Sequence, residues 1–130
     1  MEETPVDIGQ IALVNCPLEF GNYRFVQFYG PNDLPIARVG IFSEHPQIAV
    51  RFCQEAGIDA KYDHEKKKFW LPEDCGYKLV GAGFCGIYPE EKIVAYGDNS
   101  MSLKMYPDPE HLEKLMKHFP EWTLKQGIYL

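Results

Sequence analysis

The sequence lacks any apolar run long enough to cross a membrane, and it has no excess of basic residues. Its longest apolar runs, such as Ile11 to Val14, fall far below the roughly 18 residues that a membrane-spanning helix needs. Thirteen Lys and Arg stand against nineteen Asp and Glu, which gives a net charge of −6 at pH 7. Negative charge repels phosphate backbones and anionic lipid surfaces. The sequence therefore argues against membrane and nucleic-acid partners.

Metal-ligand spacing and a secretory signal are also missing. No C-x-x-C pair and no H-x-x-x-H pattern occurs, and the four histidines share no ligand spacing with the four cysteines. The amino terminus, residues 1–5, is acidic where a secretory signal would be basic, and no apolar segment follows it. We therefore expect a cytoplasmic protein with free thiols and with neither a metal nor another cofactor.

Nothing in the composition points to disorder or to a fibrous protein. The chain has 130 residues, of which 45% are hydrophobic and 25% charged, with 11 Gly and 10 Pro. These values are close to the averages of globular proteins, and the length suits one domain. We expect a single domain over residues 1–130.

The first half of the chain predicts two strands, a helix and a hairpin. Aromatic and β-branched residues indicate strands over 23–29 and 36–42. Apolar residues on one helical face between Ser43 and Gly57 predict a helix that Ser43 caps, with Pro46 in its first turn. Residues 61–71 are typical of a hairpin, and the lysines of its turn are expected to face solvent.

The second half predicts further strands and a second helix. Residues 77–84 form an expected strand whose Gly81 and Gly83 indicate a bulge or a close approach by another segment. A compact strand follows over 92–96, and an alternating run over 101–106. Asp108 and Pro109 start a helix that Pro120 stops, and a last strand is possible within 122–129. The fold class is α/β: a mixed β-sheet flanked by two α-helices.

His45 is the first candidate for chemistry because it lies where a strand leads into a helix. The positive end of a helix dipole disfavours an imidazolium, so His45 is expected to stay neutral, as a general base or nucleophile must. The same helix end attracts phosphate. The competing interpretation is an ordinary capping or surface histidine.

The loop Gly97-Asp98-Asn99-Ser100-Met101 is the second candidate. Successive backbone N–H groups in a polar turn after a strand can form an anion-binding nest, and Ser100 adds a hydroxyl group. A plain connecting turn is the competing interpretation.

With these residues in view, the chain resembles the janus/ocnus family of protein-histidine phosphatases. Lys92-Ile93, Tyr96-Gly97, the Ser100-Met101 pair, a helix and then residues 119–122 follow the family's pattern at nearly the same spacing. Earlier in the chain, Glu44 and His45 resemble the family's helix start with its essential histidine. Arg24 matches a basic residue before a strand, and residues 81–83 resemble a glycine run.

The resemblance implies a metal-independent hydrolase that acts on a phosphohistidine-containing protein. His45 would be the general base or nucleophile, and Arg24, Asn99, Ser100 and Met101 would hold the phosphate. The sequence departs from the family at two places. The loop holds one extra residue between Gly97 and Ser100, which places Asp98 near the expected anion, and Phe84 stands where the family has an arginine. The alternative is an inactive relative that binds a phosphorylated or acidic protein. The oligomeric state is left open.

Overall fold

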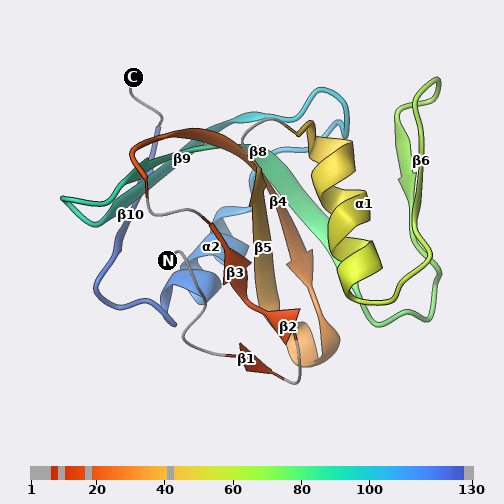
Figure 1. Ribbon diagram of the computed structural model, residues 1–130, viewed down its shortest axis with the longest axis horizontal. Coiled ribbons are helices and arrows are strands. Elements are labelled where there is room, and N and C mark those ends of the chain that lie inside the picture. The colour runs from red at the N-terminus through yellow and green to blue at the C-terminus, as the bar shows by residue number, and fades with distance from the viewer. Residues whose placement is uncertain (1–6, 9–10, 17–18, 41–42, 128–130) are drawn as a thin grey trace.

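A six-stranded mixed sheet forms the centre of the computed structural model (Figure 1). The structure describes the chain except for residues 1–6, 9–10, 17–18, 41–42 and 128–130. The strand order is β10-β9-β8-β4-β5-β3, and the outer strands β3 and β10 run parallel to their neighbours. The bounds are β3 (Val14–Asn15), β4 (Gly21–Tyr29), β5 (Pro35–Gly40), β8 (Lys78–Tyr88), β9 (Ile93–Asn99) and β10 (Thr123–Gln126).

Helices α1 (His45–Glu55) and α2 (Pro109–Met116) cover opposite faces of this sheet (Figure 1). The pleat of β4 explains the arrangement, since neighbouring side chains of a strand point to opposite faces. Phe28 packs on Phe52 of α1 with ring centroids 4.6 Å apart, and Gln27 contacts His111 of α2. The expected α/β domain, with a mixed sheet and two helices, is confirmed.

The sequence predicted the N-cap residue correctly for α2 but not for α1. Asp108 caps α2 as expected, because its carboxylate accepts the His111 N–H at 3.3 Å. The predicted cap of α1 is wrong, since Glu44 holds that position and its N–H donates to the Gln47 side chain at 2.9 Å. The Ser43 hydroxyl instead accepts a hydrogen bond from Arg51. A serine one residue too early cannot reach the first free N–H groups.

The strands also differ from the prediction in extent. β8 runs to Tyr88, beyond the expected end at Phe84, and the expected alternating run 101–106 is a series of turns. A single bridge between Ser100 and Met105 closes these turns, and Lys104 adopts a positive φ of 56° that a strand does not allow. The last strand is confirmed as β10. The ends of two predicted strands, residues 41–42 and 128–129, lie outside the described residues.

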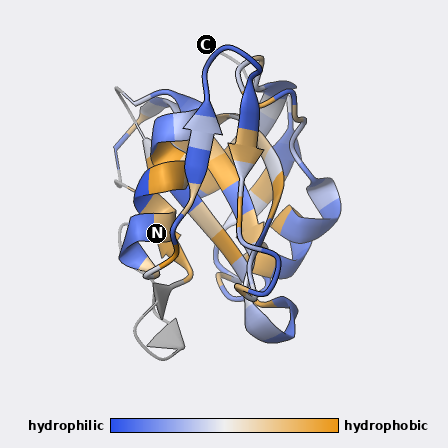
Figure 2. Ribbon diagram, turned by 90° about the vertical axis from the view of Figure 1, so that its right-hand side faces the viewer, coloured by the Kyte–Doolittle hydropathy of each residue, from blue (hydrophilic) through white to orange (hydrophobic). Residues whose placement is uncertain are grey.

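Short strands complete the fold: β3 at the edge of the main sheet, and two strand pairs outside it. The sequence analysis did not predict β3 or the pair β1 (Asp7–Ile8) and β2 (Ile11–Ala12), because two-residue strands leave no periodic pattern. A short 3₁₀ turn, η1 (Pro31–Asp33), links β4 to β5. β6 (Lys61–Asp63) and β7 (Lys68–Trp70) form the predicted hairpin, whose lysine-rich turn is exposed and hydrophilic (Figure 2).

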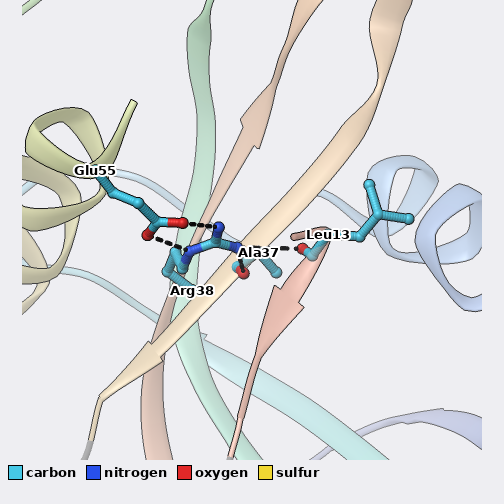
Figure 3. Close-up of polar contacts among 4 residues, drawn as sticks. All are labelled: Leu13, Ala37, Arg38 and Glu55. Carbon is cyan, nitrogen blue, oxygen red and sulfur yellow. Dashed lines mark hydrogen bonds and ion pairs between the residues drawn. The ribbon is translucent and has the colours of Figure 1, made fainter. Parts of the chain in front are cut away.

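The buried side chain of Arg38 joins helix α1 to the segment just before β3. Arg38 of β5 is 5% exposed and forms a forked ion pair with Glu55, at 2.8 and 3.2 Å (Figure 3). Its remaining nitrogen donates to the carbonyls of Leu13 and Ala37, and the guanidinium lies over the Phe52 ring at 4.8 Å. Because every nitrogen has a partner, the charge is compensated within the fold.

Candidate active site

His45 lies at the start of α1 with its ring against strand β8. The residue is 3% exposed, and the Nε2 atom is 2.7 Å from the carbonyl oxygen of Gly83. A carbonyl oxygen only accepts hydrogen bonds, so Nε2 carries the proton. The other ring nitrogen, Nδ1, makes no hydrogen bond within the described part of the chain. The neutral ring therefore presents a lone pair at Nδ1, as a general base or nucleophile requires.

The protein environment favours this neutral form. Burial lowers the pKa of His45 below its ordinary value of 6.5, and the positive charge of Arg24 lowers the pKa further. The Gly83 carbonyl and Glu44 act in the opposite direction and are outweighed. A neutral His45 at pH 7 agrees with the expectation from the helix dipole, although burial is the larger cause.

Gly83 connects His45 to the loop that follows β9. It pairs with Asn99 of β9, while the next residue, Phe84, pairs with Gly97. Asp98 is thus the unpaired residue of a β-bulge, with a φ of 54° and an exposed side chain. The extra loop residue is absorbed in the bulge, so Asn99 keeps its pairing beside the His45 partner.

This bulge explains why position 83 holds glycine. A Cβ atom at Gly83 would lie 2.5 Å from the Pro107 side chain and 2.7 Å from the Asp98 carbonyl oxygen. No side chain fits between two such close neighbours. The close approach that the sequence analysis gave as one alternative is found at Gly83. The other alternative, a bulge in the same strand, is found next to Gly81, where Gln27 pairs with Gly81 and Phe28 with Leu79.

Ser100 itself has few free groups. It is fully buried, its N–H donates to the Met105 carbonyl at 2.8 Å, and its hydroxyl accepts the Leu103 N–H at 3.1 Å. These bonds make Ser100 the residue that shapes the turn. The donors left over are the backbone N–H groups of Met101 and Ser102, which make no hydrogen bond within the described part of the chain.

The side chains of Asn99 and Met101 are not arranged to bind phosphate. Met101 is 71% exposed, so it contributes its backbone alone. The Asn99 side-chain nitrogen lies 3.7 Å from the Met101 sulfur. The loop therefore offers main-chain donors in a turn, as anion-binding nests do.

Tyr62, which the sequence analysis did not single out, links this loop to the start of α1. Its hydroxyl donates to the Ser102 carbonyl at 2.5 Å. Glu44, which precedes His45, contributes to the raised pKa of the Tyr62 hydroxyl, after burial. Tyr62 also lines one groove together with Pro46 and Gln47 from the first turn of α1. The loop and the helix start are thus gathered around one phenol.

Arg24 lies beside the same histidine through Phe84. The Arg24 guanidinium is 5.5 Å from the centre of the Phe84 ring, and that ring meets His45 edge-on at 5.1 Å. Arg24 and Phe84 face each other in the pairing of β4 with β8. The structure therefore brings Arg24 and His45 to one face of the sheet, with the Phe84 ring between them.

The other nucleophiles and ligand types offer less. Burial raises the pKa of the Cys16 and Cys53 thiols to about 12. Burial also raises the pKa of the Cys85 thiol well above its ordinary value, so all three thiols stay protonated at neutral pH. Among the described residues, no three His, Cys, Asp or Glu side chains gather as a metal site would need. His45 is thus the best-placed nucleophile or base of the described chain.

The described helices include none with the length and apolar character to cross a membrane. No family model matches the chain, and no curated protein is significantly similar to it.

Proposed function

We propose that this protein is a metal-independent phosphatase of the janus/ocnus type that hydrolyses phosphohistidine in proteins. The observation that carries the proposal is the hydrogen bond from His45 Nε2 to the Gly83 carbonyl. It fixes the tautomer, and it leaves the Nδ1 lone pair as the reactive atom of a buried neutral ring.

The chemistry asks little of the protein beyond position and charge. In the overall reaction the P–N bond of phosphohistidine breaks and an oxygen atom of water bonds to phosphorus. The substrate imidazole departs with a proton, which makes it a good leaving group. His45 Nδ1 either takes a proton from the attacking water or attacks phosphorus itself and is released by water in a second step. Both routes use the same lone pair.

The charge of Arg24 and the free donors of the loop suit the phosphoryl group. Arg24 brings a positive charge to the same face of the sheet, and the N–H groups of Met101 and Ser102 are unpaired donors. Donors fixed in advance stabilise the equatorial oxygens in the transition state more than water does. In this proposal Asn99 and Ser100 hold the turn in shape, while Met101 and Arg24 contact the phosphate.

A phosphohistidine peptide tests the proposal directly. The wild-type protein is expected to release inorganic phosphate, and His45→Ala is expected to reduce the rate by at least about 100-fold, the usual contribution of a general base. His118→Ala removes an imidazole outside this site and serves as the matched control. Circular dichroism of each variant checks folding, and His45→Asn provides a second replacement that keeps a side-chain donor.

A second candidate is an inactive relative that binds a phosphorylated or acidic protein. Phe84 favours it, because an aromatic ring stands where the family has a cation. Removing a charged contact to a phosphoryl group costs several kcal/mol of transition-state stabilisation, roughly 3 kcal/mol for one donor. If the wild-type protein binds the phosphopeptide but releases no phosphate, the inactive binding protein is the correct candidate.

A further inference from the structure

We infer that the groove between α1 and the β6–β7 hairpin binds an acidic, extended segment of the substrate protein next to the phosphohistidine. This inference rests on the proposed function, which it deepens. The groove has a volume of about 580 Å³. Its polar lining comes from Gln47, Arg51 and Gln54 of α1 and from Lys61, Tyr62 and His64 of the hairpin.

The charge of this groove is opposite to that of the whole protein. The chain carries a net charge of −6, yet the groove is lined by Arg51 and Lys61 and by no carboxylate. A cationic groove on an acidic protein attracts acidic segments selectively, because the rest of the surface repels them.

Both cations are free to meet a ligand. Arg51 is exposed, and one of its nitrogens donates to the Ser43 hydroxyl at 3.2 Å. The Lys61 ammonium lies 6.0 Å from the centre of the Trp70 ring, an exposed contact that leaves its charge in water. Neither forms an ion pair among the described residues.

The carboxylate of Asp63, next to the groove, is already engaged. One of its oxygens accepts the N–H groups of Glu65 and Lys66 at 3.0 and 3.2 Å, which holds the hairpin turn. Asp63 is not among the residues that line the groove, and it pairs across the hairpin with Lys68 rather than with Lys61.

The groove adjoins the loop of the candidate active site through Tyr62. Pro46, which follows His45, is part of its lining, and Tyr62 joins the groove to the Ser102 carbonyl of the loop. From there the lining follows successive turns of α1 to Gln54. A substrate chain whose phosphohistidine lies against the turn at Met101 and Ser102 would continue past Tyr62, between the helix and the hairpin.

The remaining lining suits a peptide backbone better than a compact ligand. Pro46, Val50 and Ala60 add apolar surface to the same groove. Recognition of an extended peptide commonly combines such apolar contacts with polar groups at the rim.

The test uses the full chain and two fluorescent ten-residue peptides with a central unphosphorylated histidine. One peptide has glutamates on both sides of the histidine, and the other has glutamines. Fluorescence anisotropy is expected to show tighter binding of the glutamate peptide, weakened about tenfold by the double variant Arg51→Glu/Lys61→Glu. The glutamine peptide is expected to respond much less.

A matched control makes the same change of charge elsewhere. Lys117→Glu/Lys125→Glu alters the net charge by the same amount at exposed positions outside the groove. The inference requires that this control weakens binding of the glutamate peptide far less than the groove variant does. Equal losses in both would mean that overall charge governs binding, and would overturn it.

The phosphorylated forms of the same peptides separate this inference from the proposed function. Hydrolysis of both with the same KM leaves the function standing and overturns the groove. Groove-dependent binding of the glutamate peptide without phosphate release refutes the function and supports the groove. If sedimentation shows a dimer that Arg51→Glu/Lys61→Glu dissociates, the occupant of the groove is a second copy of the chain. If single-stranded DNA binds more tightly than the glutamate peptide, the occupant is a nucleic acid. Either result overturns the inference.

Discussion

Gln27 and His111 join the centre of the sheet to helix α2 through side chains that are both fully buried. The Gln27 amide nitrogen donates to His111 Nδ1 at 3.0 Å, and His111 Nε2 donates to the Phe28 carbonyl at 2.8 Å. The same amide binds the backbone of Asp108 in both directions, at 2.8 and 2.9 Å. Each polar atom of the pair is satisfied, so this network specifies where α2 starts.

Gly81→Ala is expected to disrupt this network. An added Cβ would lie 2.3 Å from the Gln27 amide oxygen and 2.9 Å from the Asp108 nitrogen. We expect a loss of about 2 to 4 kcal/mol in the free energy of unfolding, measured by urea denaturation. The same substitution in a Gln27→Ala background should cost less, because one of the two colliding groups is gone. Equal costs in both backgrounds would contradict the described geometry.

The network also predicts that the protein loses stability in mild acid. Burial is the largest cause of the lowered pKa of His111, and protonation would place two donors, Nδ1 and the Gln27 amide nitrogen, face to face. The folded-state pKa lies below the unfolded value of about 6.5, so the unfolded chain binds more protons. The stabilisation that neutral His111 gives the folded state is fully present above the unfolded-state pKa. It is lost as the pH falls towards and through the folded-state pKa. His45 acts in the same direction.

Urea denaturation at several pH values between 7.5 and 5 measures this loss. His118→Asn replaces a histidine outside the network and should leave the pH dependence unchanged. A stability that is constant over this range would contradict the two buried neutral rings.

Arg38→Met is expected to destabilise the contact between α1 and β3. It removes the forked pair with Glu55 and the bond to the Leu13 carbonyl, while the methionine fills part of the space over Phe52. Because Glu55 is 42% exposed, water can solvate its freed carboxylate, so we expect about 2 kcal/mol rather than the larger cost of a fully buried pair. Lys92→Met breaks an exposed pair with Glu121 and should change the free energy of unfolding by less than about 0.5 kcal/mol.

Arg24→Met is expected to change both the rate and its pH dependence. Loss of a cation near the phosphoryl group should lower the rate of phosphohistidine hydrolysis about 10- to 100-fold. Because Arg24 lowers the pKa of His45, its removal should also raise the pH at which activity falls on the acid side. Lys125→Met is the control for charge. If the pH at which activity falls on the acid side is unchanged, Arg24 does not act on the reacting imidazole.

Local patterns in the sequence predicted the elements that depend on neighbouring residues. The apolar faces of α1 and α2, the Asp108 cap and the long strand β4 are all of this kind. The sequence also predicted a neutral histidine at the start of α1, but it argued from the helix dipole, whereas burial of the ring is the largest cause of the lowered pKa.

Contacts between distant segments were beyond such reasoning. The partner of the His45 ring is a backbone carbonyl 38 residues away, and the pairing of β8 with β9 decides which one it is. The role of Ser100 was missed in the same way, because its N–H and hydroxyl are used up by a turn that returns at Met105. Tyr62 gave a weaker signal still, since a tyrosine in a hairpin is common.

The central claim is that the Nδ1 atom of His45 and the free amides of the loop face one phosphoryl group. The most direct test is a titration of ¹⁵N-labelled protein with inorganic phosphate, followed by NMR of the histidine ring nitrogens and the backbone amides. The account predicts an Nε2–H tautomer for free His45, and a joint change at His45 Nδ1 and the Met101 amide as phosphate binds. Phosphate that shifts neither group, or an Nδ1–H tautomer, would contradict it.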